Sequence, residues 1–280
     1  MSKGLTKEKL EQIYETECIQ NKMRYSEVRK KYNIPRGTWD YWIRKKLGKK
    51  ADLRRHPAND NFFDSIDTEI KAYLLGYLYA DGYLASDGRM GIRLQEDDVE
   101  ILELIQKYIC PRSTIESSNN QNFKRKPQHS IRWKSKRMYA RLQELGFHID
   151  KTHTDSDIFK YIPEDMKKHF LRGYTDGDGS IQAYRLDNGT YRKIGIVWCN
   201  GSKEILEDIM RWLPKYSWHL YNNGTYFTLG NYIQNEASEV IQFLYKDANF
   251  FLSRKMLQVN KIIDFYKSSN TELTNQITKG

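Results

Sequence analysis

Two acidic residues that recur in the same local context give the strongest chemical signal in the chain. Residues 73–84 read YLLGYLYADGYL and residues 170–181 read FLRGYTDGDGSI, so that Asp81-Gly82 is repeated as Asp178-Gly179. A single Asp-Gly would only indicate a helix end or a tight turn. Two copies with matched apolar and small residues upstream indicate an internal duplication, in which the two acids occupy equivalent positions.

Small residues precede each acid at a spacing of four, which places them on one side of a helix and lets two helix backbones approach closely. These residues are Gly76, Ala80, Gly173 and Gly177. If the helices pack with the same polarity, Asp81 and Asp178 meet at their C-terminal ends, where the helix dipole disfavours negative charge. Two carboxylates held there require a cation. Neither segment contains His or Cys, and an oxygen-only ligand set favours Mg²⁺ over zinc, with Mn²⁺ able to substitute.

The two segments resemble a known family signature. Residues 74–82 and 171–179 are similar to the paired motif of the LAGLIDADG homing endonucleases, and the resemblance covers roughly residues 64–266. It implies an α+β fold in which two pseudo-symmetric αββαββα repeats form a DNA-binding saddle, with the signature helices at their interface. It further implies that Asp81 and Asp178 are catalytic, metal-binding acids of a site-specific double-strand DNA endonuclease. Such an enzyme hydrolyses one phosphodiester per strand across the minor groove and leaves short 3′ overhangs.

The resemblance also implies further catalytic residues. In the family, a polar residue at the end of an early strand and a basic residue at the end of a later one organise water, and by motif position these are Gln95 and Lys134. A phosphate contact without a catalytic part is the alternative for Lys134. The matching positions in the second repeat are Cys199 and Gly230, so that half lacks a helper or takes one from elsewhere. Two further candidates follow the last helical stretch of each repeat: Lys151 and Lys255.

The charge distribution agrees with a polyanionic partner. The chain has 280 residues, 46 Lys or Arg and 36 Asp or Glu, and a formal net charge of +10. The surplus lies at the N-terminus, where residues 1–56 hold 16 basic and 7 acidic side chains while the remainder is nearly balanced. Within the remainder, residues 112–141 hold nine basic side chains and the single acid Glu116. Both regions are predicted to face phosphate, although the net charge alone would also fit a soluble basic protein.

The N-terminal segment reads as three helices. Thr6 can cap a helix that runs to about residue 19, a second helix begins near Ser26, and Pro35 opens a third over about residues 36–47. This pattern looks like a helix-turn-helix DNA-binding domain, and the alternative is a small helical bundle with a solvated basic face. The predicted core includes Ile34, Trp42 and Ile43. The predicted DNA contacts on the third helix are Thr38, Trp39, Arg44 and Lys45.

Alternating polar and apolar residues predict strands with one polar face in both repeats. In duplex DNA that face would lie in the major groove, although an ordinary solvated sheet face is the alternative for any single residue. The predicted DNA contacts of the first repeat are Arg89, Arg93, Gln95, Arg132, Lys134 and Lys136. Those of the second are Gln182, Tyr184 and Lys193. Because the two faces differ residue for residue, the target is predicted to be asymmetric.

These observations divide the chain into residues 1–56, a helix-turn-helix domain with a basic linker, and two repeats over residues 57–155 and 156–280. Three cysteines without CxxC spacing suggest neither a disulfide framework nor a zinc site, and fit a reducing cytoplasm. No secretory or membrane-spanning segment is apparent. The predicted partner is double-stranded DNA, bound by a monomer without an obligate protein partner. A non-cleaving DNA-binding regulator on the same scaffold and an intron RNA maturase are the alternative functions.

Overall fold

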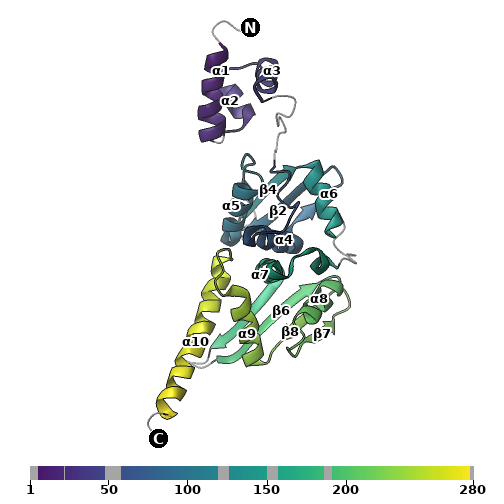
Figure 1. Cartoon of the computed structure of the whole chain (residues 1–280), viewed down its shortest axis with the longest axis vertical. Coiled ribbons are helices and arrows are strands. Elements are labelled where there is room, and N and C mark those ends of the chain that lie inside the picture. Colours follow the sequence, from purple (N-terminus) through teal and green to yellow (C-terminus); the bar gives the residue numbers. More distant parts are fainter. Residues whose placement is uncertain are drawn as a thin grey trace.

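The computed structural model describes residues 6–21, 23–47, 58–118, 126–149, 157–185 and 191–277. A small helical bundle lies at one end of an elongated molecule, two sheet-and-helix layers follow, and a long C-terminal helix lies at the other end (Figure 1). The predicted domain boundaries between residues 56 and 57 and between residues 155 and 156 lie outside the described residues, as does Lys151.

The N-terminal bundle folds around a core of its own. Its elements are α1 (Lys7–Ile13), the π-helical η1 (Tyr14–Gln20), α2 (Tyr25–Lys31) and α3 (Arg36–Leu47). The Thr6 side chain accepts a hydrogen bond from the Lys9 backbone N–H, which caps α1 as predicted. Asn33 takes a left-handed conformation with φ of 49° and turns the chain into α3. The bundle core consists of Leu10, Ile13, Tyr14, Cys18, Val28, Ile34, Trp39, Trp42 and Ile43.

The first repeat follows the predicted αββαββα order. Its elements are α4 (Glu69–Asp81), β1 (Tyr83–Leu84), β2 (Arg89–Gln95), the short 3₁₀ turn η2 (Glu96–Asp98), α5 (Val99–Tyr108), β3 (Glu116–Ser118), β4 (Gln128–Lys134) and α6 (Lys136–Glu144). The four strands form an antiparallel sheet in the order β1-β2-β4-β3.

The second repeat has the same order and the same sheet topology. Two 3₁₀ turns, η4 (Ile158–Tyr161) and η5 (Glu164–Met166), lead into it. Its elements are α7 (Lys167–Asp178), β5 (Gly179–Arg185), β6 (Tyr191–Asn200), α8 (Glu204–Trp212), β7 (His219–Asn222), β8 (Phe227–Asn231), α9 (Gln234–Tyr245) and the additional α10 (Ser253–Ile277). The strand order β5-β6-β8-β7 repeats that of the first sheet, so the predicted duplication and the α+β class are confirmed.

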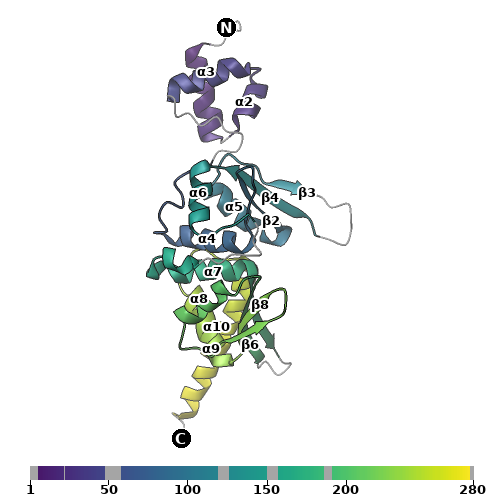
Figure 2. The same cartoon turned by 90° about the vertical axis from the view of Figure 1, so that its right-hand side faces the viewer.

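Each sheet buries one face under helices, and the alternation along β2 shows why. Met90, Ile92 and Leu94 are buried, whereas Arg89 and Arg93 are exposed on the opposite face. The helices α4 and α7 lie side by side between the two sheets in both views (Figure 2). A single apolar core extends through both repeats, separate from the core of the N-terminal bundle.

No helix among the described residues is long and apolar enough to cross a membrane.

Candidate active site

The two signature helices touch through reciprocal backbone contacts. A Cβ atom added to Gly76 would lie 2.0 Å from the carbonyl oxygen of Phe170, and one added to Gly173 would lie 2.0 Å from that of Tyr73. Each glycine thus meets the residue three positions before the other glycine. The contact is symmetric, and it is possible only because neither helix carries a side chain at this point.

The contacts also define the relative direction of α4 and α7. Gly76 meets Phe170, and further toward the C-terminus of both helices Gly177 meets Ala80, where an added Cβ would lie 2.4 Å from the Ala80 methyl group. Because the contacts advance together along both helices, the helices run with the same polarity and their C-terminal ends coincide. An Asp81 carboxylate oxygen lies 3.3 Å from the position that a Gly177 Cβ would take, directly beside the residue that precedes Asp178.

The glycine after each acid allows the chain to leave the helix sharply. A Cβ on Gly82 would lie 2.6 Å from the carbonyl oxygen of Leu78, and a Cβ on Gly179 would lie 2.6 Å from that of Thr175. Leu78 and Thr175 occupy the same motif position. The glycines therefore let β1 and β5 begin at once, which keeps the acids at the junction of helix and sheet.

A pocket of about 290 Å³ opens beside the exposed Asp178 and is lined by both repeats. The first repeat contributes the end of α4 and the loop after α6, and the second contributes the end of β6 and the β7–β8 turn. The lining residues are Tyr79, Ala80, Gly82, Leu84, Gly146, Phe147, His148, Asp178, Cys199, Asn200, Gly201 and Tyr226.

Two carboxylates from different repeats, each at a helix C-terminus, suit a hard divalent cation. No group of three or more His, Cys, Asp and Glu side chains that could hold a metal occurs in the described part of the chain. Asp81 and Asp178 would therefore supply one oxygen-donor side chain each, and water and phosphate oxygens would complete the coordination. This set fits Mg²⁺ or Mn²⁺ rather than zinc.

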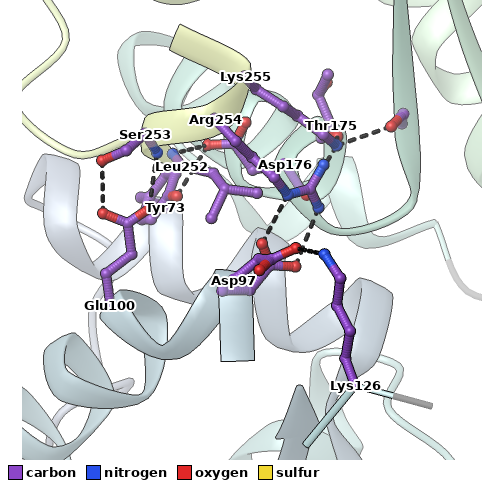
Figure 3. Close-up of polar contacts among 12 residues, drawn as sticks. Tyr73, Asp97, Glu100, Lys126, Thr175, Asp176, Leu252, Ser253, Arg254 and Lys255 are labelled. Atoms are coloured by element: carbon purple, nitrogen blue, oxygen red, sulfur yellow. Dashed lines mark hydrogen bonds and ion pairs between the residues drawn. The ribbon is translucent and has the colours of Figure 1, made fainter. Parts of the chain in front are cut away.

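The other acid of the second motif, Asp176, lies in the protein interior. Asp176 is fully buried and accepts hydrogen bonds from the Tyr245 hydroxyl at 2.5 Å, the Leu252 backbone N–H at 2.7 Å and the Tyr73 hydroxyl at 2.8 Å. Burial raises the pKa of Asp176. The hydrogen bond from Tyr73 on α4 to Asp176 on α7 joins the two repeats (Figure 3).

The first turn of α10 fastens the same region, as Figure 3 shows. The buried Lys255 ammonium group donates to the backbone carbonyl of Gly179 at 2.7 Å and to that of Asp176 at 2.8 Å, and also to that of Thr175. Burial lowers the pKa of Lys255 to about 8. Its positive charge thus lies at the C-terminal end of α7, where it complements the helix dipole. The sequence indicated Lys255 only by its place after the last helical stretch.

The two predicted helpers of the first repeat lie at opposite ends of one ladder. Gln95 faces Gln128 and Lys134 faces Arg89, a separation of roughly 20 Å at about 3.4 Å per residue. They cannot contact the same phosphate. The Lys134 ammonium group donates to the Asp87 carbonyl at 3.0 Å, in the β1–β2 turn.

The ladder registers also correct the predicted match between the repeats. Tyr83 and Ser180 are each the second residue after the acid, and they pair with Gly91 and Val197 respectively. The next residues, Ile92 and Trp198, are therefore equivalent, and they face Ile131 and Leu229 on the following strand. Gln95 therefore corresponds to Gly201, and Lys134 to Tyr232, rather than to Cys199 and Gly230 respectively. Gly201 lines the pocket beside Asp178. By this correspondence Gln95 belongs to the end of the first sheet that lies near the acids, and Lys134 belongs to the far end.

The predicted DNA contacts of the sheets lie mostly on the outer faces. Arg89, Arg93 and Gln95 are exposed on β2, and Lys136 is exposed at the start of α6. In the second repeat, Tyr184 is 60% exposed, Gln182 is half-buried, and the exposed Lys193 ammonium group lies 4.7 Å from the centre of the Tyr232 ring. Arg132, half-buried on β4, forms an ion pair with Glu116 on the adjacent β3.

One predicted DNA contact of the bundle is wrong. Trp39 is completely buried and packs against the rings of Tyr25 and Trp42, so it cannot reach a base or a phosphate. A three-helix bundle must bury one face of each helix, and on α3 that face includes Trp39 as well as the predicted core residue Trp42. Arg44 and Lys45 are exposed, and Thr38 is half-buried.

No protein-family model matches the chain, and none of the curated proteins matches it. Among solved structures, the chain is similar to I-SmaMI bound to its uncleaved DNA target in the presence of calcium ions, with a TM-score of 0.48 and 13% identity over 74% of this chain and 96% of that one. It is similar to the LAGLIDADG homing endonuclease I-GzeII in complex with its DNA target, with a TM-score of 0.48 and 12% identity over 73% and 91%. It is also similar to I-DmoI in complex with DNA and Mn, with a TM-score of 0.41 and 16% identity over 64% and 98%.

Proposed function

We propose that this chain is a site-specific DNA endonuclease of the LAGLIDADG homing type. It hydrolyses one phosphodiester in each strand of a long asymmetric duplex site, across the minor groove, with Mg²⁺ or Mn²⁺. The observation that carries this proposal is the parallel seam of α4 and α7, which brings Asp81 beside Gly177 and so next to Asp178. One acid from each repeat, with the two side chains close together, suits an enzyme that cuts both strands of a duplex at one site.

The chemistry at each strand needs an activated water, neutralisation of the phosphate charge and stabilisation of the leaving 3′ oxygen, which divalent ions supply when bound. Asp81 and Asp178 hold the ions by one carboxylate each. Lys255 fixes the carbonyl groups around the end of α7 and thereby the backbone that carries Asp178. Gln95, at the end of its sheet near the acids, is the residue of the first half that orients water. Lys134, at the far end, is bound to Asp87 and takes no part at the phosphate that is cut.

The sheets and the bundle supply recognition. The exposed polar faces of β2 and β4 and of β5 and β6 read the two half-sites, and because these faces differ, the site is asymmetric. The bundle adds contacts through α3, with Thr38, Arg44 and Lys45 toward DNA. Arg112 ties the bundle to the first repeat, because its guanidinium group lies 4.7 Å from the centre of the Tyr25 ring.

Cleaved-site selection from a randomised duplex library, followed by substitution of the acids, tests this function. Asp81→Asn and Asp178→Asn should each abolish metal-dependent cleavage of the selected site while preserving its binding in Ca²⁺. Asp67→Asn is the matched control, because Asp67 forms a surface ion pair with Lys71 at 2.7 Å, and it should cleave normally. Specific binding by the wild type without cleavage in Mg²⁺ or Mn²⁺ would instead identify a regulator. Binding of RNA that outcompetes duplex DNA at matched salt would identify a maturase.

A further inference from the structure

Three side chains at the tip of the β1–β2 hairpin form a closed arrangement on the outer face of the first sheet. Arg89 begins β2 and Lys134 ends β4, and the two face each other across the ladder. Two like charges directly opposite one another in a sheet repel. Asp87, in the turn that precedes Arg89, lies between them and compensates both.

The Asp87 carboxylate is itself held in place. One oxygen accepts a hydrogen bond from the Arg89 backbone N–H at 3.1 Å, and the other lies 2.7 Å from Arg89 Nε and 3.4 Å from Lys134 Nζ. The Lys134 ammonium group also donates to the Asp87 carbonyl oxygen at 3.0 Å. Gly88 closes the turn in the left-handed region, with φ of 78°, and its N–H donates to the Ala85 carbonyl at 2.9 Å. Backbone geometry thus fixes the carboxylate, and the carboxylate fixes the arginine.

The edge of the guanidinium group that Asp87 engages decides what Arg89 can bind. Asp87 contacts Nε on one side edge of the guanidinium group, and the end of the group carries one N–H of Nη1 and one of Nη2. Their paired donors match the O6 and N7 acceptors of guanine in the major groove. A phosphate at the same place would meet a negative carboxylate close by, and that repulsion disfavours sequence-independent binding.

We propose that Asp87 is a specificity-determining residue that presents Arg89 to a guanine in the outer part of the first half-site. This inference rests on the proposed function, since it assumes that the outer face of the first sheet lies in the DNA groove. Asp87 touches neither DNA nor metal and acts through Arg89, so it is a positioning residue. Arg89 lies roughly 20 Å from the end of the sheet near the acids, so the guanine lies away from the cut.

Equilibrium binding in Ca²⁺ to the selected target, and to targets substituted at each base pair of the first half-site, tests the role. With wild type, one guanine should stand out, and its replacement should weaken binding about 10- to 100-fold. Arg89→Ala should remove the discrimination at that base pair. Asp87→Asn should reduce it to a few-fold while strengthening binding to unrelated duplex, with a steeper dependence on salt.

Two controls separate this role from general charge and from folding. Asp67→Asn removes the same negative charge in the segment just before α4, away from the sheet face, and should leave the base preference intact. Asp87→Glu keeps the charge but lengthens the side chain. Its affinity for unrelated duplex should be as low as that of the wild type, but its discrimination at the guanine should stay below that of the wild type. An unchanged base preference in Asp87→Asn with intact specific binding would overturn the inference and leave the endonuclease standing. Absence of any specific DNA binding by the wild type would overturn the proposed function itself.

Discussion

Replacing Gly173 by Ala tests the seam on which the site depends. The added Cβ would lie 2.0 Å from the Tyr73 carbonyl oxygen, whereas carbon and oxygen in close contact lie about 3.3 Å apart. The helices must therefore separate by roughly 1.3 Å, because the struck atom belongs to the backbone and cannot rotate away. Overpacking of this kind costs about 1–3 kcal/mol or more, and the better helix propensity of Ala returns about 1 kcal/mol. We expect a net loss of about 2 kcal/mol in the free energy of unfolding.

Urea denaturation followed by circular dichroism measures this loss, with cleavage of the selected target measured in parallel. Gly76→Ala provides an internal comparison, because its Cβ would meet Phe170 at the same 2.0 Å, and it should lose stability to the same extent. Gly37→Ala on α3 is the control with open space, since nothing lies within 4 Å, and it should stabilise the bundle by up to about 1 kcal/mol. Wild-type stability in Gly173→Ala would refute the close backbone contact and with it the placement of the acids.

Three further predictions concern Lys255 and the N-terminal bundle. Lys255→Met removes the hydrogen-bond donor of three carbonyl groups at the end of α7, so it should cost about 3 kcal/mol of stability and slow cleavage. Lys261→Met, on the exposed side of the same helix, should change neither the stability nor the cleavage rate. Urea denaturation and plasmid cleavage measure the two effects. The hydrogen bond from Lys31 lowers the pKa of Glu17 from 4.5 to about 2, so the stability from this carboxylate is present above about pH 4.5 and is lost as the pH falls toward 2. Thermal melts across this range should show a loss in the wild type that Glu17→Gln lacks. Trp39→Ala should cost the bundle about 3–5 kcal/mol, whereas Arg44→Ala should weaken DNA binding without moving the melting temperature.

The sequence predicts those features that repeat or alternate locally. The duplicated segments alone predict the close contact between α4 and α7, because Gly76 and Gly173 occupy equivalent positions in two similar helices. The limits of α3 follow from Pro35 and from the run of residues up to Leu47, and the exposed face of β2 follows from its alternation. Each of these signals is visible within one segment of about a dozen residues, or from a comparison of two such segments.

Features that depend on tertiary contacts escape such reasoning. On α3, Trp39 lies between Thr38 and Asp40, in a helix with three aromatic residues, and no local pattern tells which aromatic ring the other helices of the bundle cover. The match of Lys134 to Gly230 failed because the strands before each position differ in length, so counting along the chain does not preserve the register. Lys255 comes from a helix nearly eighty residues beyond α7, and nothing in its own neighbourhood shows that it reaches the Gly179 carbonyl.

The reciprocal contact at Gly76 and Gly173 also has a bearing on how such a protein can be redesigned. Main-chain atoms make it, so it does not depend on which side chains cover the outer strands of either half. A repeat with a different DNA-facing surface can be fused to either repeat of this protein as long as its own signature helix keeps a glycine at the helix contact. The fused product would then inherit one recognition surface from each parent, together with an undisturbed pair of acids.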